Sequence, residues 1–126
     1  MKNLRVLIIL IAVFLCYQTP SLMAQEASLP YAEIPAAPKK YNACTVAARM
    51  IDGLGFRYYW ATEGLRAEDL AYKPSESART ADATLDHIYG LVSVVVNSVK
   101  GVPSIRPMTG MPTTYEEKRR WTLLAL

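Results

Sequence analysis

Apolar side chains recur at steps of three and four residues from residue 46 to residue 65, which predicts a helix over residues 43–65. This spacing places side chains on one face of an α-helix and is incompatible with one face of a strand. Asn42 is the expected N-cap, and Gly53 and Gly55 favour either close packing of a neighbour or a kink. The stripe consists of Val46, Met50, Leu54, Tyr58, Ala61 and Leu65.

The same criterion predicts two further helices, over residues 81–99 and 114–126. Thr80 and Thr114 are their expected N-caps, and Glu117 completes a capping-box pattern with Thr114. The expected buried face of the second helix consists of Leu85, Ile88, Val92, Val95, Val96 and Val99. The third helix carries the apolar residues Trp121, Leu123, Leu124 and Leu126.

Polar and proline-rich segments separate these helices. Residues 66–79 are expected to form a loop, with Leu70 and Tyr72 in contact with the helices. Residues 101–112 contain three prolines and two glycines, which predicts a long irregular connection. The elements therefore predict an all-α fold of the up-down four-helix-bundle type, truncated here to three helices.

The sequence ends in WTLLAL, within the third predicted helix and without a glycine or proline stop signal. We therefore expect residues 41–126 to form a helical bundle that is incomplete at its C-terminus, a fragment or a truncated gene product. Three helices with wide apolar faces leave an apolar seam that a fourth would cover. A homodimer through this open seam is an expected way of covering it.

The N-terminus has the pattern of a secretory signal peptide, expected over residues 1–24. Lys2 and Arg5 precede an apolar run of eleven residues, 6–16, whereas a membrane-spanning helix needs about 20. Residues 25–40 are expected to form a proline-rich linker without regular structure. These features predict an exported protein, periplasmic or extracellular, without membrane attachment after cleavage; the alternative is an uncleaved N-terminal anchor.

Composition limits the chemistry of the chain. Its 126 residues allow one domain, and its net charge of +3 falls to about +1 without Lys2 and Arg5, so nucleic acid is not an expected partner. Two cysteines and one histidine exclude a closed zinc cluster built from Cys and His within this chain. Cys44 is expected to be a small buried side chain. The basic run 118–120 is expected to form a solvated face.

Four short segments resemble the first half of a DinB-like four-helix protein. They are YYWATEGL at 58–65, LAYKP at 70–74, ART at 78–80 and LDHI at 85–88. In that family a first helix leads into a loop that ends in proline. A second helix then begins after Ser or Thr and carries an L-x-H-I motif about one turn from its start. The resemblance covers roughly residues 41–126, the N-terminal part of such a protein.

The resemblance implies a four-helix bundle that holds a divalent metal, zinc or nickel, through three histidines. His87 matches the first of these ligands, and the other two are expected beyond the chain end in an H-x-x-x-H pair. The metal is therefore expected only in a full-length protein. Related proteins include transferases that use low-molecular-weight thiols. The residues present supply no catalytic constellation, because no nucleophile is placed beside His87. The alternative function is a non-catalytic helical binding or structural module of the cell envelope.

Overall fold

A computed structural model of the protein describes residues 28–126. The predicted signal peptide at 1–24 lies outside the described residues. In chain order the helices are α2 (Ala43–Ala61), α3 (Ala67–Ala71), α4 (Ala81–Lys100) and α5 (Tyr115–Ala125). Within residues 28–126 there is no strand, so the all-α class is confirmed.

The predicted N-caps are all present. The Asn42 side chain accepts a hydrogen bond from the backbone of Thr45 at 3.0 Å, and the Thr45 hydroxyl accepts one from the backbone of Asn42 at 2.8 Å. Thr80 caps α4 through a 3.0 Å bond from the backbone N–H of Ala83. At the start of α5, Thr114 accepts a bond from the Glu117 backbone at 3.3 Å. Each cap satisfies a backbone donor that has no partner within the helix.

The first helix is shorter than predicted and ends at Ala61, not at Leu65. The backbone N–H of Thr62 bonds to the carbonyls of Tyr58 and Tyr59, which closes the last turn. Gly64 then adopts a φ of 66°, a left-handed conformation that an L side chain rarely adopts. The chain therefore leaves the helix direction before the end of the apolar stripe.

A short helix, α3, occupies part of the segment expected to be a loop. Asp69 accepts hydrogen bonds at 3.0 Å from both the backbone and the side chain of Arg66, and this local arrangement fixes the first turn. A helix of one turn is too short to produce a periodic signal in the sequence. Leu70 packs against the core as expected, whereas Tyr72 is exposed, so its expected contact was wrong.

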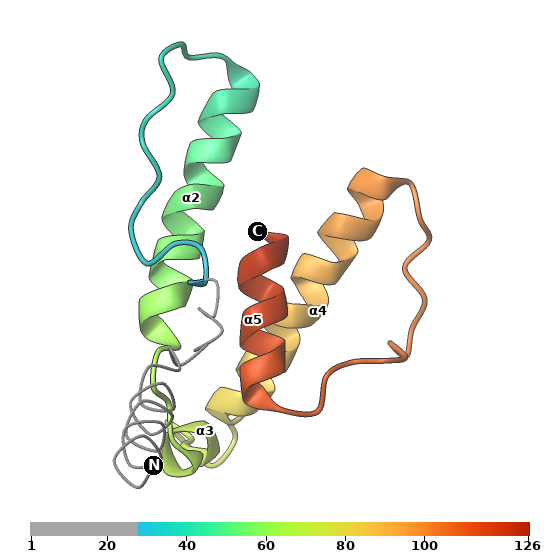
Figure 1. The fold of residues 1–126 in the computed structure, drawn as a ribbon. Coiled ribbons are helices and arrows are strands. Elements are labelled where there is room, and N and C mark those ends of the chain that lie inside the picture. The colour runs from blue at the N-terminus through green and yellow to red at the C-terminus, as the bar shows by residue number, and fades with distance from the viewer. Residues whose placement is uncertain (1–27) are drawn as a thin grey trace, which may run out of the picture.

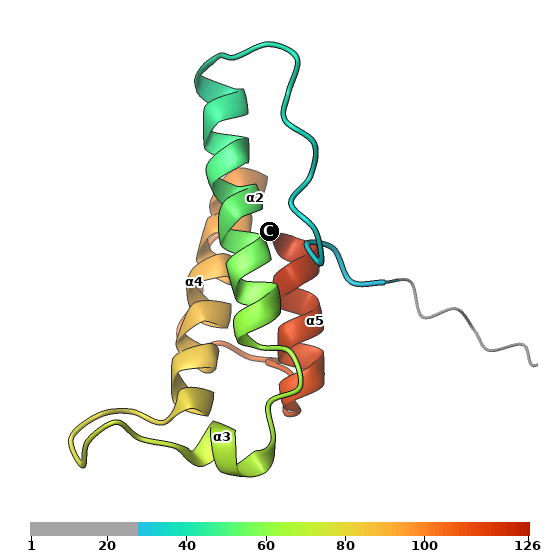
Figure 2. The same ribbon diagram turned by 90° about the vertical axis from the view of Figure 1, so that its left-hand side faces the viewer.

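The helix α5 lies between α2 and α4 (Figure 1). Residues of α5 meet α4 in the same order along both helices, since Lys118 bonds to Asp82 and Trp121 stacks on Tyr89. These two helices therefore run in the same direction, and the connection 101–114 returns to the beginning of α4 (Figure 2). The helix α2 runs in the opposite direction to both. The chain thus departs from up-down order at its last connection.

The core is small and takes one buried side chain from each long helix: Tyr58, Leu85 and Leu123. Leu123 is the most enclosed of these, with 1% of its surface exposed. Around them lie partly buried side chains from every described element and from the N-terminal segment: Leu29, Tyr31, Tyr59, Leu65, Leu70, Ile88 and Tyr115. The core therefore forms at the end of the molecule where α3 connects α2 to α4.

The segment 28–42, which we call the strap, has no regular secondary structure but packs along α2. The indole of Trp60 donates to the backbone carbonyl of Ala32 at 3.1 Å. The ring of Tyr31 occupies the space at Gly55, where an added Cβ would come within 2.6 Å of a ring atom. Gly55 therefore receives an aromatic ring of the strap and not a neighbouring helix.

The contrast between two adjacent leucines of α5 tests this core. Leu123 is buried, whereas its neighbour Leu124 is 60% exposed. Leu123→Ala is expected to lower the free energy of unfolding by about 2–5 kcal/mol, because it leaves a cavity among three helices. Leu124→Ala, the matched control, is expected to change it by about 0.5 kcal/mol or less. Urea unfolding followed by circular dichroism measures both, and equal effects would contradict this description of the core.

Candidate functional site

An apolar stripe is exposed along the first half of α2. Val46, Met50 and Leu54 follow one another at four-residue steps, and 48–73% of each side chain is exposed. The same stripe becomes buried one turn later, at Tyr58. Of the six residues of the predicted stripe, only Tyr58 is buried, and Leu65 is partly buried.

A second apolar stripe is exposed along the last half of α4. Leu91, Val95 and Val99 also follow one another at four-residue steps, with exposed fractions of 49–85%. Val95 and Val99 were expected to be buried, and the structure corrects this expectation. Residues 88–99 contain no Asp, Glu, Lys or Arg. We call the six residues of the two stripes the open apolar face.

The far ends of the two stripes have no helix between them because α5 is short. At 1.5 Å per residue, the 11 residues of α5 extend about 16 Å, whereas α2 and α4, with 19 and 20 residues, extend about 28–30 Å. The buried residues of α4 accordingly lie between Leu85 and Ser93. Beyond the last residue of α5, α2 and α4 continue without a helix between them (Figure 1).

His87, the candidate metal ligand, is exposed on α4. Three side chains near it in sequence or of ligand chemistry, Asp82, Asp86 and Cys44, are not gathered around it. Asp82 and Asp86 bind Lys118, and Cys44 is exposed at the start of α2 rather than buried as expected. Among residues 28–126, no group of three or more His, Cys, Asp or Glu side chains is placed to hold a metal ion.

Lys118 is buried, which corrects the expectation that the basic run 118–120 forms a solvated face. Its ammonium group contacts carboxylate oxygens of Asp82 at 3.0 Å and Asp86 at 2.6 Å, and 8% of its side chain is exposed. Burial by itself lowers the pKa of Lys118, but the hydrogen bonds and charges of Asp86 and Asp82 outweigh it and raise this pKa above 10.5. Lys118 therefore attaches α5 to α4.

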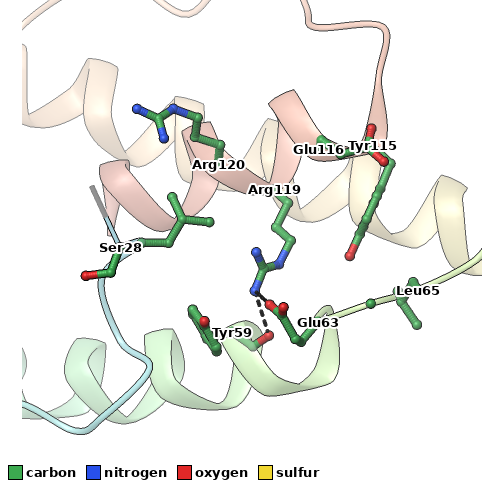
Figure 3. Close-up of a pocket in the computed structure, with 10 residues that line it drawn as sticks. Ser28, Tyr59, Glu63, Leu65, Tyr115, Glu116, Arg119 and Arg120 are labelled. Atoms are coloured by element: carbon green, nitrogen blue, oxygen red, sulfur yellow. Dashed lines mark hydrogen bonds and ion pairs between the residues drawn. The ribbon is translucent and has the colours of Figure 1, made fainter. Parts of the chain in front are cut away.

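Arg119 is also buried, on the side of α5 that contacts α2. Its guanidinium donates to the Thr62 hydroxyl at 3.0 Å and to the backbone carbonyl of Tyr59 at 3.2 Å. It also pairs with the carboxylate of Glu63, and it lies 4.7 Å from the centre of the Tyr59 ring (Figure 3). Of the basic run, only Arg120 is exposed.

The spacing of α5 contained a signal for this burial. Tyr115, Lys118, Arg119, Thr122 and Leu123 follow steps of three, one, three and one, which is the spacing of a helix face that packs against neighbours. The prediction from sequence gave more weight to the charges than to this spacing. A lysine or arginine can occupy a buried position of a helix when carboxylates lie opposite it. Whether carboxylates lie there depends on the tertiary fold, which the spacing along one helix does not reveal.

A hollow of about 520 Å³ lies beside Arg119 (Figure 3). Its charged lining is balanced, since Arg119 and Arg120 are matched by Glu63 and Glu116. The guanidinium of Arg119 already bonds to Thr62, Tyr59 and Glu63. The charged lining of the hollow therefore has no net charge, and the open apolar face is the more distinctive surface.

No family model, curated protein or solved structure matches this chain. Among the described residues, no helix combines the length and apolar character needed to cross a membrane.

The burial of Lys118 leads to a prediction about the free energy of unfolding at alkaline pH. Because the folded state raises the pKa of Lys118, its stabilisation is complete below about pH 10.5 and is lost as the pH rises through the folded-state value. Lys118→Met is therefore expected to weaken the dependence of unfolding free energy on pH in this range. Urea unfolding at several pH values measures it, with the exposed Lys100→Met as control. Parallel pH curves for wild type and Lys118→Met would contradict the assignment.

Proposed function

We propose that this chain is a helical binding module that acts outside the cytoplasm and whose open apolar face takes up another α-helix. The observation that carries the proposal is the open apolar face itself. A helix without charged residues is normally buried, yet the last half of α4 exposes three large apolar side chains. Large apolar side chains exposed in stripes along two helices are typical of an interaction site.

The spacing of the two stripes indicates the kind of partner. Steps of four residues match the ridges of an α-helix, and helices pack by placing such ridges into the grooves of their neighbours. The two stripes extend over about 12 Å each, or slightly more than two helical turns. An amphipathic helix that lies along α2 and α4 is therefore the proposed occupant, and with it the fold becomes a four-helix bundle with one crossover connection.

Export is part of this proposal and depends on the predicted signal peptide at 1–24. The short apolar run behind Lys2 and Arg5 supports it. Expression in a secreting host followed by mass spectrometry of the N-terminus is expected to give a chain that begins near residue 25. Recovery of intact Met1 from the membrane fraction would contradict export and leave the helix-binding proposal unaffected.

The apolar dye ANS tests whether the open apolar face is accessible. Dilute protein is expected to enhance ANS fluorescence, and Val95→Glu is expected to reduce this enhancement because it places a charge in the middle of the α4 stripe. Ala83→Glu adds the same charge to an exposed position of α4 outside the stripe and serves as the matched control. Equal fluorescence for both variants would contradict the proposed binding face.

A second candidate function, divalent-metal binding, is favoured by the location of His87. His87 is exposed and precedes Leu91 of the α4 stripe by one helical turn. A helix that binds along this stripe would bring its own side chains near the imidazole. The resemblance to DinB-like proteins supports zinc or nickel as the metal, with two histidines of the bound helix as the remaining ligands. Chemistry on thiol substrates would follow only from such a completed site.

Calorimetric titration with zinc and nickel tests this candidate. The 126-residue chain is expected to bind either ion weakly or not at all, because one histidine supplies too few ligands. A version extended by a helix with an H-x-x-x-H pair is expected to bind one ion and to lose it on His87→Ala. Tight stoichiometric binding by the 126-residue chain, or indifference of the extended version to His87→Ala, would overturn this assignment.

A further inference from the structure

We propose that the helix that covers the open apolar face is α4 of a second copy of this chain, in a two-fold symmetric dimer. The inference rests on the proposed function, since it identifies the helix that the face takes up. In this arrangement the two α4 helices pack antiparallel to each other. The α4 helix of each copy lies along the open apolar face of the other.

The absence of charge along residues 88–99 of α4 favours pairing of this segment with itself. In a two-fold interface the same surface is present on both sides, so residues near the axis face their own copies. Charged residues there would meet like charges. Residues 88–99 contain none, and this part of α4 exposes Leu91, Val95 and Val99.

The chain itself also contains a helix of the kind that the open apolar face would take up. An occupant of the open apolar face needs an uncharged helix with apolar residues at four-residue steps, and α4 has this stripe and exposes it. Val95 is the middle residue of the stripe. In an antiparallel pair centred on the stripe, Leu91 of each copy lies opposite Val99 of the other, and the two Val95 side chains lie beside the axis. The stripe of α2 then covers the flank of the second α4.

The exposed area predicts the strength of this dimer. A fully exposed aliphatic side chain has on the order of 100 Å² of apolar surface, so the six partly exposed residues of the open apolar face provide roughly 300 Å² per copy. A standard stable interface buries about 800 Å² per partner. We therefore expect a dimer that dissociates on dilution, not a permanent one.

Analytical ultracentrifugation of the 126-residue chain, without its signal peptide if cleavage occurs, measures this equilibrium. Between about 1 µM and about 1 mM, the weight-average mass is expected to rise from that of a monomer toward that of a dimer. Val95→Glu is expected to remain monomeric over the whole range, and Ala83→Glu to behave like the wild type. Circular dichroism of each variant establishes that it is folded.

Cysteine crosslinking tests the register and does not depend on the folding of Val95→Glu. In a Cys44→Ser background, Val95→Cys is expected to form a disulfide-linked dimer with oxidised glutathione, because the two Cβ atoms lie close to the axis. Ala83→Cys in the same background is expected to remain a monomer. A Val95→Cys variant that crosslinks no faster than Ala83→Cys would overturn the proposed pairing.

The outcomes separate this inference from the proposed function. A chain that stays monomeric at about 1 mM, but whose ANS fluorescence is still reduced by Val95→Glu, would overturn the dimer and retain the helix-binding face. Loss of both effects would overturn the two proposals together. A dimer that persists unchanged in Val95→Glu would show that the copies associate through another surface, and it would also overturn the inference.

Discussion

The position of α5 depends on two adjacent buried cations that contact opposite neighbours. Lys118 reaches the carboxylates of Asp82 and Asp86 on α4, and Arg119 reaches Glu63 and Thr62 on α2. Residues that are adjacent in a helix point about 100° apart, so this pair can connect α5 to both neighbours at the same level. The three carboxylates are each more than a third exposed, so solvent screens the ion pairs and limits their contribution to stability. Their main effect is to fix the direction and level at which Leu123 enters the core.

Local features of the fold were predictable from sequence because they depend on neighbouring residues. The caps at Asn42, Thr80 and Thr114 are examples, since each involves a side chain and a backbone group three residues away. The end of α2 was missed by four residues because the apolar stripe continues to Leu65 after the helix has ended. Leu65 remains at the core from a turn, and periodicity alone does not distinguish a turn from one more helical step.

The site was less predictable, because a pattern identifies an apolar face but does not reveal whether a neighbour covers it. Val92 and Val95 belong to the same expected face of α4, yet Val92 is buried and Val95 is exposed, because α5 extends along only part of α4. The burial of Lys118 required knowledge that Asp82 and Asp86 lie opposite. His87 was predicted as a metal ligand from a resemblance to a family. A single histidine beside apolar residues does not reveal whether its side chain is buried, and the structure shows that His87 is exposed on α4.

The contact between Tyr31 and Gly55 has a mechanical consequence. The strap lies along α2, and its attachments there are the ring of Tyr31 at Gly55, the bond from Trp60 to Ala32 and the bond from Arg49 to the carbonyl of Pro35. A pulling force applied at residue 28 would first load Leu29, which packs against the core, and then the contacts of the strap with α2. These contacts would all have to separate before the tension reached Asn42 and the start of α2. Because Gly55 has no side chain, it leaves room on α2 for the ring of Tyr31. Gly55 thus sets the point at which the strap is held on α2.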